Sequence, residues 1–452
     1  MTLTNLSQVV DQELRGSKRL RISGRVQRAS GLLLEASGLD LAVGDECLLA
    51  LPEGHLPAEI VGFSGSVSYL MPLAPLRGVG PGTRVVPVAR RGLPDTDRLM
   101  GRVIDALGAP LDGGESISTP VFDRRSATLV TSINPLDRKP IGEVLDVGVR
   151  SINGLLTVGV GQRLGIFAGS GVGKSVLLGM LARFTAADVV VVGLIGERGR
   201  EVQEFIEDNL GSGLAKSIVV AAPADASPAL RLRGANLAME LAERLRDKGK
   251  KVLLLMDSLT RVAQAQREIG LSMGEPPTVK GYTPSAFAAL PKLVERAGQT
   301  AKSGGSITAF FTVLMEEDDL QDPVVDAARA VLDGHIVLSR QLADRGHYPA
   351  IDVEASVSRL MLKLADEAQR DAATRFRALW SRYAEQQDLI SVGAYQAGSD
   401  PETDAAIAMK PNLSSYLVQK PEHRVSLAES IENLKSLQQQ VPAAGGQLVS
   451  NG

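Results

Sequence analysis

A glycine-rich stretch at residues 165–175 has the residue types and the spacing that bind nucleotide phosphates. An apolar run ending at Ala168 leads into Gly169–Gly173, and Lys174 and Ser175 follow directly. This order is typical of a P-loop, in which the backbone N–H groups of the turn and of the next helix face phosphate oxygens. Lys174 is expected to reach the β- and γ-phosphates of ATP, and the Ser175 hydroxyl to ligate Mg²⁺.

The strict motif begins with glycine, and the small Ala168 takes that place here. The alternative is a glycine-rich turn between a strand and a helix that binds nothing, and the Lys-Ser ending argues against it. The residues expected to contact the nucleotide are Gly169, Ser170, Gly171, Val172, Gly173, Lys174, Ser175 and Val176.

Three carboxylates have positions that suit magnesium and water chemistry. The apolar run Val252–Met256 ends in Asp257, which is the Walker B form and predicts a carboxylate beside the P-loop that supports Mg²⁺. A second strand ends in the charged stretch Gly196–Glu201. Because hydrolysis needs a group that orients water and takes up its proton, Glu197 is the candidate base, and Glu201 could support the metal's waters. Alternatively, this stretch is a solvated turn or Glu197 pairs with a neighbouring arginine.

A third constellation lies between Ser339 and Arg359. Tyr348 stands beside a proline after a charged loop and could stack on adenine. Arg359 could be an arginine finger, a cation over the γ-phosphate that a neighbouring subunit often supplies. Residue type alone does not distinguish these two from a surface tyrosine and a surface arginine.

The composition is that of an ordinary globular protein with a sizeable core. The 452 residues are 44% hydrophobic and 22% charged, which predicts two or three domains. The formal net charge of -3 argues against a dedicated nucleic-acid binder. Cys47 is the single cysteine, so no intrachain disulfide forms and a reducing compartment is expected. With no signal-peptide pattern and no long apolar run, a cytoplasmic location is expected.

The order of patterns along the chain predicts five segments. Residues 1–18 indicate an amphipathic helical arm with a basic flank, either packed on its own domain or docking on a partner helix or an anionic membrane. Residues 19–92 have short strands separated by glycine turns, typical of a small closed β-barrel. Residues 93–362 alternate apolar strands with helical patterns, which indicates an α/β domain with a parallel sheet covered on both faces. Residues 363–436 indicate a helical domain, and 437–452 a flexible tail.

Taken together, these stretches resemble the hexameric P-loop ATPases related to rotary ATP synthase catalytic subunits (F-type and V-type), and within them the type III secretion ATPases of flagellar export. The resemblance covers roughly residues 20–430. The stretches that carry it are Ala168–Ser175, Gly193–Glu201, Met256–Arg261, Ala265–Gly270, Gly274–Pro277, Gly281–Ser285, Leu332–Arg340 and His347–Arg359.

The resemblance implies a RecA-like ATPase core between the β-barrel and the helical domain, and an ATP hydrolase that uses ATP and Mg²⁺. It implies that Lys174 and Ser175 bind phosphate and Mg²⁺ and that Asp257 supports the metal. Glu197 is then the catalytic carboxylate, with Arg198 beside it. Tyr348 matches the adenine-stacking tyrosine, and Arg359 matches the finger given to the next protomer.

The resemblance also implies partners. It predicts a homohexamer at the inner face of the cytoplasmic membrane that energises type III protein export. It further implies a stator-like regulatory partner at the N-terminal arm, a coiled-coil stalk protein at the ring centre, an export-gate membrane protein, and export chaperones with their substrates. No nucleic-acid partner is expected, because the barrel offers few aromatic residues for stacking.

Four alternatives remain open at this point. Val192–Ile195 and Ala221–Asp225 resemble the flagellar branch more than the injectisome branch. Ala265–Gly270, Gly274–Pro277 and Val392–Asp400 favour an export ATPase over a rotary proton-translocating subunit. An RNA translocase of similar ring form would show RNA-stimulated hydrolysis. A non-hydrolysing binding platform would show no turnover, and Glu197 argues against it.

Overall fold

The computed structural model describes residues 23–88, 90–117, 121–122, 133–315, 319 and 321–441. Two compact units divide the chain, Met1–Gly92 with Pro120–Ala127 and Leu93–Thr119 with Thr128–Gly452. The expected N-terminal helix at 1–17, and residues 442–452 of the expected tail, lie outside the described residues.

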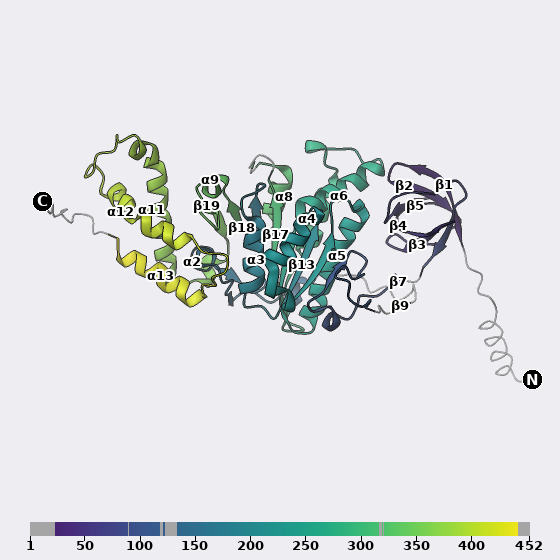
Figure 1. Ribbon diagram of the computed structural model, residues 1–452, viewed down its shortest axis with the longest axis horizontal. Coiled ribbons are helices and arrows are strands. Elements are labelled where there is room, and N and C mark those ends of the chain that lie inside the picture. Colours follow the sequence, from purple (N-terminus) through teal and green to yellow (C-terminus); the bar gives the residue numbers. More distant parts are fainter. Residues whose placement is uncertain are drawn as a thin grey trace, which may run out of the picture. The chain divides into compact units, whose positions relative to one another are not determined.

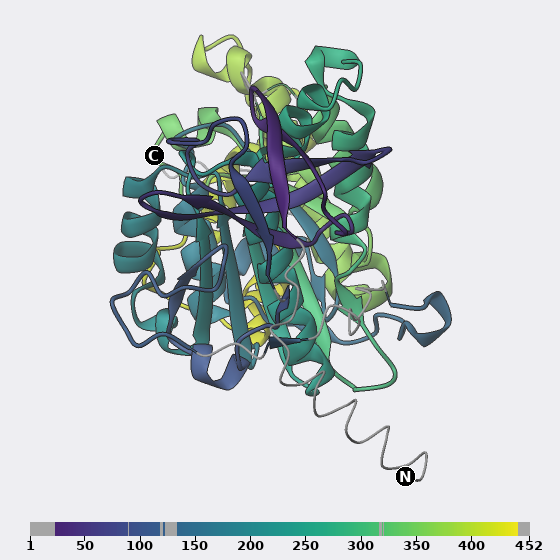
Figure 2. The same cartoon turned by 90° about the vertical axis from the view of Figure 1, so that its right-hand side faces the viewer.

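Six antiparallel strands of the first unit close into a barrel, as the glycine spacing predicts (purple in Figures 1 and 2). Their order around the barrel is β1 (Gly24–Ser30), β2 (Leu33–Ser37), β5 (Val67–Pro72), β4 (Gly54–Ser64), β3 (Glu46–Leu51) and β6 (Arg84–Pro87). Alternate apolar residues such as Leu34, Leu49 and Leu70 fill the interior. The apolar pattern predicts a strand at Glu59–Phe63, but β4 starts earlier, because its pairing with β3 continues to Leu51 and Gly54.

The second unit is built on a sheet whose strands are parallel except at one edge and in one short pairing (Figure 1). The order across the sheet is β19 (Ile351–Ser358), β18 (Gly334–Leu338), β12 (Arg163–Ala168), β17 (Ser306–Leu314), β15 (Lys251–Asp257), β13 (Val189–Ile195), β14 (Ser217–Ala222) and β8 (Val103–Asp105). The edge strand β19 runs antiparallel to β18, and the short β16 (Gly298–Gln299) pairs antiparallel with β17. All other neighbours are parallel, so their carboxyl ends meet at one edge.

Helices cover both faces of this sheet, as the alternation of patterns predicts. Alternate residues of β13 show the division, since Val190 and Val192 join one apolar cluster and Val189 and Val191 join the other. Helix α3 (Lys174–Phe184) contributes to the first cluster. The second cluster contains residues of α5 (Pro228–Asp247), α6 (Leu259–Ser272), α7 (Pro284–Val294) and α8 (Pro323–Val331).

The C-terminal part is helical, and its apolar residues belong to the same core as α3. Helices α11 (Glu367–Ser391), α12 (Pro401–Leu417) and α13 (Leu427–Gln439) pack against α2 (Arg150–Leu155) (yellow-green, Figure 1). Helix α13 continues to Gln439, three residues into the segment expected to be a flexible tail, because Leu434 is buried and Leu437 packs against the core.

Two details differ from the expected pattern of strands and helices. The helical pattern predicts a helix over 284–299, but α7 ends at Val294, and Gly298, with a φ of 129°, starts the short strand β16. Strands β18 and β19 were not expected, although Ile351–Ser358 alternates buried with less buried positions as a strand does. No helix in the described part of the chain is long and apolar enough to cross a membrane.

Candidate active site

The P-loop lies between β12 and α3, at the carboxyl edge of the sheet. Gly171 and Gly173 take φ values of 77° and 87°, a left-handed backbone that favours glycine. Ala168, in contrast, is the last residue of β12 and pairs with Leu314 and Leu338. Its φ is not positive, so the local backbone does not need glycine there. The loop therefore keeps its phosphate-binding backbone conformation without the first glycine of the strict motif.

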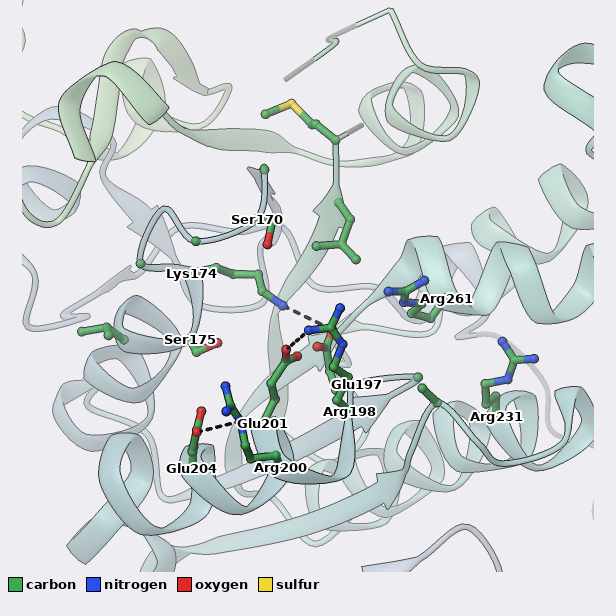
Figure 3. A pocket seen from close by; sticks show the side chains of 18 residues that line it. Ser170, Lys174, Ser175, Glu197, Arg198, Arg200, Glu201, Glu204, Arg231 and Arg261 are labelled. Carbon is green, nitrogen blue, oxygen red and sulfur yellow. Dashed lines mark hydrogen bonds and ion pairs between the residues drawn. The ribbon is translucent and has the colours of Figure 1, made fainter. Parts of the chain in front are cut away.

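Lys174 contacts two of the carboxylates that the sequence singled out, Asp257 and Glu197, and Figure 3 shows Lys174 beside Glu197. Its Nζ lies 2.5 Å from Oδ1 and from Oδ2 of Asp257, and 3.4 Å from Oε1 of Glu197. Asp257 ends β15 and also accepts a hydrogen bond of 2.6 Å from the Thr312 hydroxyl. Burial lowers the pKa of Lys174, but the attraction of Asp257 and then of Glu197 outweighs burial and raises that pKa above its usual value. The lysine is thus a fixed cation at the mouth of the loop.

Glu197 follows β13 after Gly196, whose φ of 73° turns the chain at the sheet edge. Burial, and then repulsion by Asp257, raise the pKa of Glu197 to about 7, although Lys174 lowers it. A carboxyl group whose pKa is near neutrality can accept a proton from water and release it again. Its neighbour Arg198 has 82% of its side chain exposed and forms an ion pair of 3.4 Å with Glu201.

These residues border one pocket of about 650 Å³. Its walls include the predicted residues Gly169, Ser170, Gly171, Gly173, Lys174, Ser175, Val176, Glu197, Arg198 and Glu201. Four predicted residues do not form the wall, namely Val172, Asp257, Tyr348 and Arg359. Val172 is buried in the core, and the Asp257 carboxylate is buried in contact with Lys174.

Tyr348 lies beside the P-loop. A Cβ atom added to Gly173 would be 3.3 Å from two ring atoms of Tyr348, so the ring and the loop are in contact. The residue is 40% exposed, so part of it remains accessible to a ligand. The backbone N–H of Gln419, after α12, donates to the Tyr348 carbonyl at 3.0 Å. The tyrosine is therefore held where it could stack on a base whose phosphates occupy the loop.

Arg359 is not brought to this pocket. Leu338 pairs with Ala168 and with Ile351, while Gly334, at the other end of β18, pairs with Ser358. Because β19 is antiparallel, it begins near the P-loop and ends at the opposite edge of the sheet. Arg359 follows that end, is exposed, and donates to the Arg329 carbonyl at 3.1 Å.

The pocket also contains residues that the sequence analysis missed. They are Gly196, Arg200, Glu204, Ala224, Arg231, Arg261, Leu314 and Met315. Arg231 and Arg261 lie on the side of the pocket away from Ser175 (Figure 3), and the Nε of each is buried without a hydrogen-bond partner. Each arginine stands in the first turn or two of a helix that follows a core strand. That position at the carboxyl edge of the sheet was the available signal.

The side-chain oxygens near the P-loop are suitable ligands for a magnesium ion. Among the described residues, no three His, Cys, Asp or Glu side chains gather as a site ready to hold a metal. Mg²⁺ is usually held by one or two protein oxygens together with phosphate and water, so such a cluster is not required. The Ser175 hydroxyl and the carboxylates of Asp257 and Glu201 are hard oxygen ligands of that kind.

Comparisons with known proteins agree with this geometry. The model of the ATP synthase alpha/beta family, nucleotide-binding domain, matches residues 148–358, and that of the T3SS EscN ATPase C-terminal domain matches residues 365–436. The chain is 58% identical over 437 residues to the flagellum-specific ATP synthase of Pseudomonas aeruginosa, covering 94% of each chain. It is 54% identical over 430 residues to that of Salmonella typhimurium, covering 92% of this chain and 93% of the relative.

Solved structures agree as well. The assembled ATPase EscN from the type III secretion system of enteropathogenic E. coli matches with a TM-score of 0.84 and 39% identity, over 92% of this chain and 99% of EscN. EscN in complex with its central stalk EscO matches with a TM-score of 0.82 and 38% identity, over 92% of this chain and 99% of that chain. The RecA-like core, the N-terminal barrel and the C-terminal helices expected from the sequence are confirmed. The chain therefore belongs to the family of the flagellum-specific ATP synthases, and it shares its ATPase fold with the type III secretion ATPase EscN.

Proposed function

We propose that this ATPase is Mg²⁺-dependent and that it energises the export of flagellar proteins. The observation that carries the enzymatic part is the contact of Lys174 with both Asp257 and Glu197 beside the P-loop. This arrangement puts a cation, a metal-supporting carboxylate and a base of raised pKa around the place where a γ-phosphate would lie. The greater identity to flagellar relatives than to EscN favours flagellar export over an injectisome.

Each residue has a role in the proposed hydrolysis. The backbone N–H groups of Gly169–Gly173 and the ammonium of Lys174 bind the β- and γ-phosphates, and Tyr348 stacks on adenine. Ser175, Asp257 and Glu201 would hold Mg²⁺, which neutralises phosphate charge when bound. Glu197 orients a water and takes its proton as the water oxygen bonds to the γ-phosphorus. The bond between that phosphorus and the bridging oxygen breaks, and ADP and phosphate are the products.

Arg359 completes the site of a neighbouring protomer in this proposal. Its place at the opposite edge of the sheet from the P-loop keeps it from its own nucleotide, so it serves only another copy of the chain. We therefore propose a closed ring, and by analogy with the assembled EscN and its relatives a homohexamer. The complex of EscN with its central stalk EscO supports a coiled-coil stalk partner at the ring centre.

The remaining partners follow from the family resemblance. We propose that the N-terminal arm binds a stator-like regulator. Within the active site, we propose that Arg198 acts beside the base Glu197. We also propose that the ring works at the inner face of the cytoplasmic membrane, where it meets an export-gate membrane protein and receives chaperones with their substrates.

The decisive experiment measures the Mg²⁺-ATPase rate per protomer of the purified chain against protein concentration. A rate that climbs steeply with concentration is expected, because assembly brings Arg359 to the neighbouring site. Glu197→Gln should bind ATP and not turn it over. A rate near zero at every concentration, or near-normal turnover by Glu197→Gln, would overturn the proposal.

A further inference from the structure

The backbone of Arg359 is fixed by the carbonyl group of Asp333, which precedes β18. The N–H of Arg359 donates to the Asp333 carbonyl at 3.1 Å. The side chain of Arg359, in contrast, is exposed and has only the Arg329 carbonyl as a hydrogen-bond partner among the described residues. The direction in which this guanidinium leaves the surface therefore depends on where Asp333 holds its backbone.

Asp333 is itself locked to the first residue of β12, Arg163. The Asp333 carboxylate accepts from Nε and from Nη2 of Arg163, both at 3.0 Å, which is a bidentate pair. The backbone is tied as well, because the N–H of Arg163 donates to Oδ2 of Asp333 at 3.0 Å and the N–H of Asp333 donates to the Arg163 carbonyl at 2.8 Å. Both side chains are mostly buried, so water competes little for these bonds.

A buried amide reinforces the same point. Gln162 is fully buried, and its Nε2 donates to the Asp333 carbonyl at 3.3 Å and to the Ser358 hydroxyl at 3.1 Å. Its Oε1 accepts from the N–H of Gly159 at 2.8 Å. The Asp333 carbonyl thus accepts from two donors, and the residue before Arg359 is held by the same amide.

We propose that Arg163 and Asp333, as a clamp, are positioning residues for Arg359. The proposal rests on the proposed function, in which Arg359 acts on the nucleotide of a neighbouring protomer. An arginine finger works only when its guanidinium is over the transferring phosphoryl group, and a displacement of about 1 Å can cost about a hundredfold in rate. The clamp keeps β19 in register with β12, whose other end opens the P-loop of the same protomer.

The first test compares two isosteric substitutions in bidentate pairs. Asp333→Asn removes the charge of the clamp, while Arg163 keeps its ion pair of 2.6 Å with Glu295. We expect kcat to fall at least about tenfold and KM for ATP to stay within about twofold. The matched control is Asp112→Asn, because Asp112 accepts from Nε and Nη2 of Arg102 at 2.6 and 2.8 Å, at the far edge of the sheet. The control should keep the wild-type kcat.

The second test asks whether the clamp acts through the finger. In the double variant Asp333→Asn/Arg359→Ala, the rate should equal that of Arg359→Ala alone. Mixed with Lys174→Ala, which has an intact finger and no working P-loop, Asp333→Asn should regain activity. A protomer that is merely misfolded cannot lend its P-loop, so rescue excludes a general structural defect. The kcat of Arg163→Lys, which keeps one hydrogen bond, should lie between that of the wild type and that of Asp333→Asn.

The outcomes separate the two proposals. If Arg359→Ala is active, or is not rescued by Lys174→Ala, the shared site of the proposed function fails. If Arg359→Ala is inactive and is rescued, the shared site holds and the clamp is tested by itself. The proposed clamp is then overturned by a wild-type kcat of Asp333→Asn, by a further loss of rate in the double variant, or by a failure of Lys174→Ala to rescue Asp333→Asn. A fall in kcat for Asp112→Asn equal to that for Asp333→Asn would also overturn it.

Discussion

The ammonium group of Lys174 lies 2.5 Å from both carboxylate oxygens of Asp257, and the same carboxylate accepts from the Thr312 hydroxyl. The lysine that should bind phosphate is thus paired with the carboxylate that should support the metal. In the proposed function, binding of MgATP would replace this pair, with Lys174 turning to the phosphates and Asp257 to the metal shell. Each charge compensates the other, so both groups can stay buried in the protein without nucleotide.

Removing this cation should destabilise the free protein in a pH-dependent way. Lys174→Ala leaves the carboxylates of Asp257 and Glu197 buried without their cation, a loss of about 3 kcal/mol when both are charged. Without the lysine, the pKa of Glu197 in the folded state rises further above its unfolded value, so stability falls as pH rises above about 4.5. The difference in melting temperature between wild type and variant should therefore widen from pH 5 to pH 8. Equal differences at both pH values would contradict the pairing.

The raised pKa of Glu197 predicts an acid limb in the activity of the free enzyme. Burial and then Asp257 raise this pKa to about 7. Only the ionised carboxylate accepts a proton from water, so kcat/KM should fall about tenfold for each pH unit below about 7. The measurement is kcat/KM against pH with excess Mg²⁺, which keeps the nucleotide as its magnesium complex. A profile that stays flat down to pH 5.5 would exclude Glu197 as the base.

Tyr348 should contribute to base binding and not to the chemical step. Its ring lies against Gly173, and the residue is 40% exposed. Stacking of a base on an aromatic ring contributes about 1–3 kcal/mol, so Tyr348→Ala should raise KM for ATP about tenfold or more with little change in kcat. Tyr348→Phe is the matched control and should resemble wild type. A fall in kcat at unchanged KM would assign the ring another role.

The sequence predicted the site residues that lie in short contiguous motifs. It did not predict those whose position depends on which face a helix presents or in which direction a strand runs. The P-loop is one short stretch, and Asp257 directly follows a buried run, so both could be placed from residue order. The unpartnered Nε groups of Arg231 and Arg261 depend on which face of α5 and α6 meets the pocket, and residue order does not give this. The position of Arg359 depends on β19 running antiparallel at the sheet edge, a direction that no local pattern encodes.

Gly173 should be more sensitive to substitution than Gly171, because it is constrained both by its backbone and by its neighbour Tyr348. Its φ of 87° disfavours any side chain, and an added Cβ would press on the Tyr348 ring at 3.3 Å. Gly171 has a φ of 77° and open space around it, so Gly171→Ala meets only the backbone cost of about 1 kcal/mol. Gly173→Ala should therefore weaken ATP binding more than Gly171→Ala, measured by calorimetric titration. In a Tyr348→Ala background the difference between the two should shrink, since the ring is gone, and an unchanged difference would show that the ring contact is not its cause.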